Sequence, residues 1–79
     1  MHVHEHDGFT LKLARFDELT KARGWTTDQQ RAAGLNVSHT TVGRIRRRLI
    51  KPGTKFIANA TTVLQTTVED LFDREEVAS

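Results

Sequence analysis

The residues best suited to chemistry in this chain are the closely spaced arginines of segment 44–48, which reads RIRRR. A guanidinium group attracts phosphate and can donate two parallel hydrogen bonds to a pair of acceptors such as guanine O6 and N7. The window from Gln29 to Val68 contains seven basic residues and no Asp or Glu, and the acidic residues lie toward both ends of the chain. We therefore expect these basic residues to be uncompensated and to face a polyanion.

One amphipathic helix would present most of these arginines. The segment from His39 to Arg48 fits such a helix, with Ser38 as its N-cap. At about 100° per residue, the apolar face contains Val42, Ile45 and Leu49. The opposite face contains Thr40, Arg44 and Arg47. Together with His39, this outward face carries side chains that can hydrogen-bond base edges in the major groove of DNA.

A second short helix precedes this one. Thr27 and Gln30 have the spacing of a capping box, in which each side chain bonds the backbone N–H of the other residue. Ala32 and Leu35 would face inward. Asn36 follows, and asparagine tolerates the left-handed conformation that a sharp reversal after a helix requires. The sequence therefore predicts two helices joined by a tight turn.

Three further helices would complete the core. An amphipathic helix is expected from Leu13 up to Gly24. A fourth helix is expected over residues 55–64, with Thr54 as its cap, and Thr67 would cap a short helix that starts at Val68 and ends near Phe72.

The two ends of the chain are expected to lie outside this helical core. The alternation of Phe9, Leu11 and Leu13 allows a short strand, and Val77 could pair with it. We expect one compact all-α domain of five helices over residues 11–73. Residues 1–10 would form a tail or short strand, and residues 74–79 a second tail.

Composition restricts the class of protein. The chain has 79 residues, enough for one small core, and no cysteine, which excludes disulfides and thiolate chemistry. Neither a signal peptide nor a membrane span is expected. We find no pattern typical of an enzyme and expect no cofactor. His2, His4 and His6 alternate and could chelate a metal, but we interpret them as part of a histidine-rich tail.

The order of these features resembles the Xre-type helix-turn-helix family, which includes phage repressors and Cro proteins. The resemblance covers about Leu13 to Phe72. Ala32 stands where the family has a small residue, and Asn36 at the turn position that is usually glycine. Val42 and Ile45 match the apolar pair of the recognition helix, and KFIANATTVLQTTVEDLF resembles the last two helices.

The resemblance implies a lambda-repressor-like fold and a set of DNA contacts. The expected base-reading residues are His39, Thr40, Arg44 and Arg47. The expected phosphate-binding residues are Thr27, Gln29, Thr41, Arg46, Arg48, Lys51 and Thr54. The implied function is a small transcriptional repressor that occludes a promoter, as a homodimer at least on DNA. It would act in the bacterial cytoplasm, at the nucleoid, without a small-molecule effector.

Two residues depart from the family pattern, and other functions stay open. Arg31 occupies a position that is commonly leucine, and Gly34 lies inside a helix, where it costs up to ~1 kcal/mol relative to alanine. One alternative is a protein-interaction module, such as an antitoxin or a phage protein that binds a host factor through its acidic C-terminal end. RNA binding is less favoured because the chain has no tyrosine and a single tryptophan, Trp25.

Overall fold

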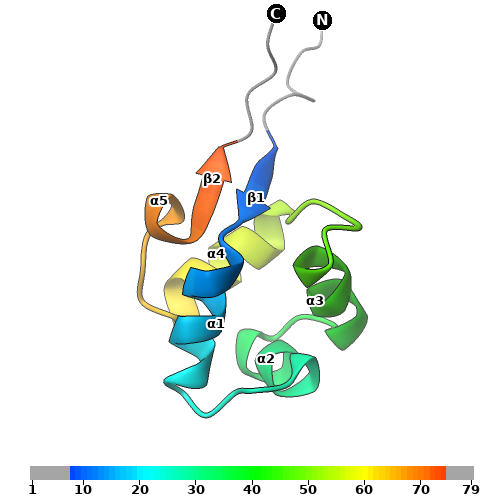
Figure 1. The fold of residues 1–79 in the computed structure, drawn as a ribbon, viewed down its shortest axis with the longest axis vertical. Coiled ribbons are helices and arrows are strands. Elements are labelled where there is room, and N and C mark those ends of the chain that lie inside the picture. The colour runs from blue at the N-terminus through cyan, green and yellow to red at the C-terminus, as the bar shows by residue number, and fades with distance from the viewer. Residues whose placement is uncertain (1–7, 75–79) are drawn as a thin grey trace, which may run out of the picture.

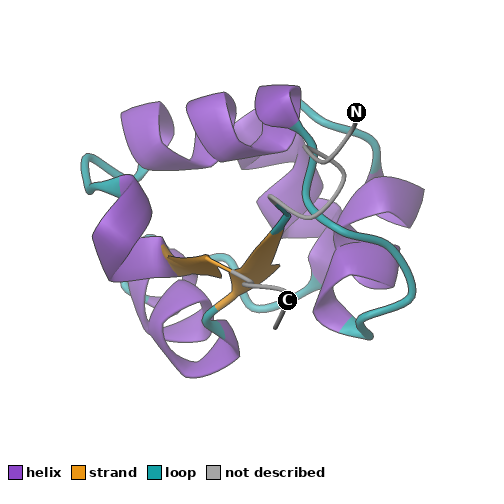
Figure 2. Cartoon of the chain, turned by 90° about the horizontal axis from the view of Figure 1, so that it is seen from above, coloured by secondary structure: helices purple, strands orange, loops and turns teal. Residues whose placement is uncertain are grey.

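The structure, a computed structural model, describes residues 8–74 and consists of helices packed around a small sheet (Figure 1). The elements follow in the order β1 (Phe9–Leu11), α1 (Leu13–Lys21), α2 (Asp28–Leu35), α3 (His39–Arg46), α4 (Thr54–Val63), α5 (Val68–Leu71) and β2 (Phe72–Arg74). Five helices lie where the sequence predicts them. Seen from above, the helices surround the two short strands (Figure 2).

The sheet corrects the all-α prediction. β1 and β2 pair antiparallel, with Phe9 opposite Arg74 and Leu11 opposite Phe72. The alternation of Phe9 and Leu11 indicates a strand, but its partner begins at Phe72, where the sequence predicts the end of the last helix. A four-residue helix stops there because Phe72 adopts an extended backbone and the chain turns back along β1. Val77, the partner suggested by the sequence, lies outside the described residues.

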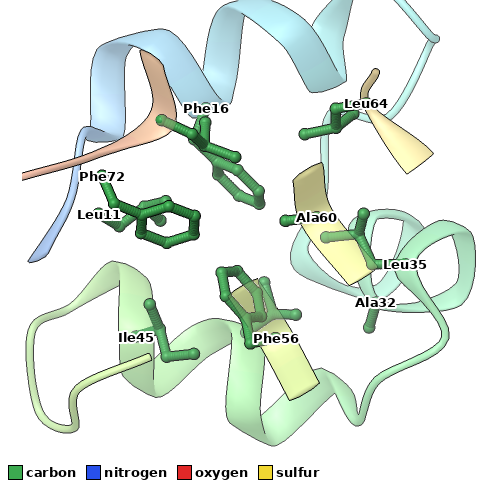
Figure 3. Packing of buried hydrophobic residues seen from close by; sticks show 11 residues of the cluster. Leu11, Phe16, Ala32, Leu35, Ile45, Phe56, Ala60, Leu64 and Phe72 are labelled. Atoms are coloured by element: carbon green, nitrogen blue, oxygen red, sulfur yellow. The ribbon is translucent and has the colours of Figure 1, made fainter. Parts of the chain in front are cut away.

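An apolar core joins the sheet to the helices (Figure 3). Phe56 of α4 lies between two other rings: its centroid is 5.9 Å from that of Phe16 and 6.1 Å from that of Phe72. Leu11, Leu35 and other fully buried side chains fill the remaining space. α2 and α3 both contribute to this core through Ala32, Leu35, Val42 and Ile45, so the two helices are anchored to the rest of the domain.

Four helices end in the same way, through a residue with positive φ. These residues are Gly24 (83°), Asn36 (59°), Arg48 (62°) and Gln65 (54°). In each case the next N–H donates to a carbonyl five residues earlier, as in the bond of 2.8 Å from Leu49 N–H to the Arg44 oxygen after α3. This is the Schellman arrangement, which satisfies carbonyls at the end of a helix. It confirms the predicted turns at Gly24 and Asn36.

The helix starts agree with the sequence except at α4. The Thr67 side chain accepts from the Asp70 N–H and caps α5, as predicted. Thr54, in contrast, is the first residue of α4, and the N-cap is Gly53, which has no side chain to accept a hydrogen bond. The prediction that Thr54 caps this helix is therefore wrong. The extended segment ends at Gly53, so α4 begins one residue earlier than the threonine pattern predicts.

Candidate nucleic-acid interface

The turn between α2 and α3 has the predicted local geometry. The Thr27 oxygen accepts from the Gln30 N–H at 3.1 Å, and the Gln30 side chain accepts in return from the Thr27 N–H at 3.2 Å. Asn36 ends α2 in the left-handed conformation, and the Ser38 oxygen accepts from the Thr41 N–H at 3.0 Å. Three residues thus separate the two helices, which share the most extensive helix–helix packing in the described chain.

Trp25 accounts for the glycine inside α2. A Cβ added to Gly34 would lie 2.3 Å from the Trp25 ring, closer than atoms can approach without a shift. The missing side chain therefore lets the half-buried indole pack directly on the backbone of α2. On its C-terminal side, α2 is held by Asn59 of α4, whose amide donates to the Leu35 carbonyl at 3.0 Å. Both contacts fix α2 against its neighbours.

Near the start of α3, the buried and the exposed face of the helix are those that the sequence predicts. Val42 and Ile45 are buried, and Gly43 is buried beside them. The exposed residues of the helix include His39, Thr40 and Arg44. Within residues 8–74, the Arg44 and Arg47 side chains form no ion pair or hydrogen bond with the protein. The N–H donors of both guanidinium groups are therefore available to another molecule.

The end of α3 differs from the prediction. The helix stops at Arg46, not at Arg48, because Arg48 adopts the left-handed conformation and the chain turns away. Arg47 lies in this turn, with its guanidinium beside Gly43. Leu49 was predicted to share the buried face with Val42 and Ile45, and this prediction is wrong, since 66% of Leu49 is exposed.

Two of the basic residues expected to be uncompensated have acidic partners. Arg46 of α3 binds the Asp17 carboxylate of α1 at 2.9 Å and that of Asp28 at 3.2 Å. Arg31 of α2 binds the same two carboxylates, Asp28 at 3.2 Å and Asp17 at 3.6 Å. We call these four residues the clamp. It joins α1, α2 and α3, and its contact with α3 is made by Arg46, the last residue of that helix.

The clamp accounts for the buried arginine at position 31 of α2. Arg31 is only 6% exposed, and its Nε donates to the buried Thr20 hydroxyl at 3.0 Å. The guanidinium therefore lies in the interior with each of its nitrogens near an acceptor, as a buried charge requires. The hydrogen bond with Asp17, followed by the charges of both acids, raises the pKa of Arg46 above its ordinary value. Arg46 is thus a charged side chain that is held in place at the C-terminal end of α3.

The remaining phosphate candidates lie on two sides of α3. Thr27 and Gln29 are exposed at the N-terminus of α2, and Thr41 is half-buried with its hydroxyl bonded to Ser38. On the other side are the exposed residues of the following loop and the start of α4: Arg48, Lys51 and Thr54. Arg48 also donates to the Leu11 carbonyl at 3.4 Å. Arg46 is bound to Asp28, which lies between Thr27 and Gln29 in the sequence, and is part of the clamp.

Sequence reasoning missed three members of the clamp as functional residues. The signal for Arg31 and Asp28 was their spacing of three residues within one helix, which allows a pair. Nothing local indicated Asp17, which is 29 residues from Arg46. His2, His4 and His6, considered as metal ligands, lie outside the described residues.

Because comparison with known proteins identifies no relative, the function has to be inferred from the geometry of the chain itself. No protein-family model, curated protein or solved structure matches the chain. Within residues 8–74, no helix has the length and apolar character to cross a membrane. The features on which a function can be built are therefore the exposed face of α3, its basic surroundings and the clamp behind it.

Proposed function

We propose that the chain binds double-stranded DNA in a sequence-specific manner and regulates transcription. In this proposal α2 and α3 form a helix-turn-helix, and α3 enters the major groove. The observation that carries the proposal is the outward face of α3 and the turn after it, where His39, Thr40 and Arg44 of the helix and Arg47 of the turn are exposed. No acidic residue occurs from Gln29 to Val68, so no carboxylate from this window opposes an approaching phosphate backbone.

Base recognition would rest mainly on Arg44. Its guanidinium matches guanine O6 and N7, and a bidentate contact of this kind contributes about 1–3 kcal/mol of discrimination. Thr40 lies one turn before Arg44 and offers a methyl group for thymine or a hydroxyl for a base edge. His39, at the first position of α3, can donate or accept a hydrogen bond. Arg47, beyond the end of α3, would reach a base or a phosphate further along the groove.

Phosphate contacts would fix the register of α3 on the duplex. The N-terminus of α2 presents unpaired N–H groups and the positive end of its dipole next to Thr27 and Gln29. The loop after α3 would contact the backbone on the other side through Arg48, Lys51 and Thr54. If each subunit neutralises about three phosphates, a dimer gives a slope of about −5 for log affinity against log salt.

Such a protein would regulate by occupying a promoter or operator. Two copies would read two half-sites about one helical turn apart, as homodimeric helix-turn-helix proteins do. Because the core of the domain is small, we propose that the regulator has no small-molecule effector. The expected location of such a regulator is the bacterial nucleoid.

Selection from a random duplex library at physiological salt tests the proposal. A recurring sequence motif is expected, and a motif with two-fold symmetry would agree with a dimer. A library that shows no enrichment over background would refute specific recognition. The protein-interaction alternative would then be favoured if a partner still binds the Arg44→Ala/Arg47→Ala double variant.

Single variants then test the role of Arg44. Arg44→Ala should weaken binding to the selected site by about 1–3 kcal/mol per half-site and relax the base preference at one position. Arg44→Lys keeps the charge but loses the bidentate geometry, so it should relax the preference while retaining more affinity. Arg74→Ala is the matched control, because Arg74 is also exposed but lies on β2. An equal loss of affinity for Arg74→Ala would contradict the assignment.

A further inference from the structure

A glycine lies inside α3, where this residue type lowers the stability of a helix. A Cβ added to Gly43 would lie 3.3 Å from an Nη nitrogen of Arg47 and 3.3 Å from Oδ2 of Asp28. The space of the missing side chain is therefore occupied by two charged groups and not by apolar core atoms. Gly34 differs, because its space is filled by the Trp25 ring. Core packing accounts for Gly34 but does not account for Gly43.

The Arg47 side chain runs back along α3 and over this glycine. Its backbone N–H donates to the Gly43 carbonyl at 3.0 Å, and its two Nη nitrogens lie 3.3 and 3.6 Å from the Gly43 Cβ position. Side chains on a helix generally point toward its N-terminus in this way. The guanidinium therefore lies about one turn before the end of α3, on the flank that faces Asp28, the first residue of α2.

Asp28 lies beside this guanidinium but does not form an ion pair with it. Its Oδ1 accepts from Arg31 and from Arg46, each at 3.2 Å. Within residues 8–74, Arg47 has no acidic partner. The two arginines and two aspartates of the clamp cancel in charge, so Arg47 carries an uncompensated positive charge on this flank of α3.

We infer that Arg47 contacts a backbone phosphate next to the start of α2, and not a base, and that Gly43 is the residue that positions it there. This inference rests on the proposed function, in which the start of α2 lies at the phosphates and Thr40 and Arg44 face the bases. The guanidinium lies on the α2 side of α3, and its free donors suit phosphate oxygens. The clamp neutralises Asp28, which would otherwise repel the same phosphate.

Binding to the selected duplex, and to duplexes with single base-pair changes, tests the role of Arg47 over a range of salt concentrations. Arg47→Ala should lower the affinity for all these duplexes by the same factor and reduce the slope of log affinity against log salt by about 0.9 per subunit. Arg47→Lys keeps the charge, and lysine binds phosphate as a point charge, so the base preference and the slope should both persist. Arg44→Lys is the matched control and should relax the preference at one position.

A double-mutant cycle tests the role of Gly43. The side chain of Gly43→Leu would occupy the place of the guanidinium, so this variant should reduce the salt slope as far as Arg47→Ala does. Added to Arg47→Ala, it should leave the slope unchanged, because no guanidinium remains to be displaced. Gly43→Ala is the matched control, since its methyl group requires a shift of only a few tenths of an ångström and should keep the slope. If thermal unfolding shows that Gly43→Leu is destabilised, Gly43→Gln repeats the test with a polar side chain of similar length.

The outcomes separate this inference from the proposed function. A relaxed preference at one base pair in Arg47→Lys or Arg47→Ala, or an unchanged salt slope in Arg47→Ala, would overturn the phosphate contact while specific DNA binding stands. A further loss of slope when Gly43→Leu is added to Arg47→Ala would overturn the positioning role of Gly43. A chain that selects no duplex would refute the proposed function, and the inference would fall with it.

Discussion

Arg46 is the residue for which sequence and structure give opposite expectations, and Arg46→Met separates them. As a phosphate contact, Arg46 would matter for DNA affinity and little for folding. As a member of the clamp, it holds α3 against α1 and α2 through Asp17 and Asp28. Methionine keeps the length and most of the volume of the side chain but removes the charge, so packing is little disturbed.

The expected loss of stability follows from the contacts and their exposure. The Arg46 side chain is 27% exposed, that of Asp28 25% and that of Asp17 40%, so water screens the pairs in part. An exposed ion pair contributes up to about 1 kcal/mol, and breaking a fully buried one costs about 3–5 kcal/mol. Arg31 still compensates both acids in the variant. We therefore expect a loss of about 1.5–2 kcal/mol, which lowers the melting temperature by roughly 10 °C.

The dependence of DNA affinity on salt then identifies the role of Arg46. A phosphate contact contributes about 0.9 to the slope of log affinity against log salt, so its loss in both subunits changes the slope by about 1.8. A clamp residue leaves the slope unchanged. We expect Arg46→Met to lose stability and keep the slope. Arg44→Met is the matched control: its melting temperature should stay nearly constant while DNA affinity falls. A reduced slope together with an unchanged melting temperature for Arg46→Met would refute the clamp.

Three further changes test other parts of the structure. Gly34→Ala should destabilise the domain by about 1–3 kcal/mol and shift the Trp25 emission to the red, because the new methyl displaces the indole; helix propensity alone predicts a gain of up to ~1 kcal/mol. Arg48→Gly should raise the free energy of unfolding by about 0.5–1 kcal/mol in denaturant titrations, because glycine adopts positive φ without strain. The hydrogen bond from Thr66, and to a smaller extent that from Arg15, lowers the pKa of Asp70. The Asp70 carboxylate therefore contributes stability above the ordinary carboxyl pKa, and this contribution is lost as pH falls through the lowered pKa.

Each of these three changes has a clear contrary result. A stabilised Gly34→Ala variant with unchanged emission would show that Trp25 does not pack on α2. A less stable Arg48→Gly variant would mean that the bond from Arg48 to the Leu11 carbonyl outweighs the strain. Asp70→Asn should remove part of the acid sensitivity seen in thermal scans below about pH 4, and an unchanged pH profile would exclude the contribution of Asp70.

Short-range features of the fold were accessible from the sequence. The capping box at Thr27, the left-handed turn at Asn36 and the cap at Ser38 depend on bonds that span three to five residues, and all three are present. The buried positions of Val42 and Ile45 follow from helical periodicity in the same way. Local chemistry therefore determined where α2 and α3 begin and how they are joined.

Features that depend on distant residues were not accessible. The strands are three residues long and pair residues more than 60 positions apart, such as Phe9 with Arg74. The acidic partners of Arg46 are 29 and 18 residues away, so a window without acids still holds a compensated arginine. Leu49 was misplaced because periodicity extends a helix until a stop signal appears, and Arg48 is a residue type that rarely adopts the left-handed conformation.

The two kinds of contact behind α3 have separate consequences for the proposed function. Val42 and Ile45 turn one face of the helix into the close-packed core, which resists rotation about the helix axis but supplies no directed bonds. The clamp, in contrast, joins Arg46 to two directed acceptors on two other helices, and hydrogen-bonded ion pairs are strongly directional. The clamp therefore adds directed bonds to the apolar packing that fixes the rotation of α3, and hence the direction in which Arg44 points. It does so through Arg46, an arginine for which the acid-free window suggested a phosphate contact.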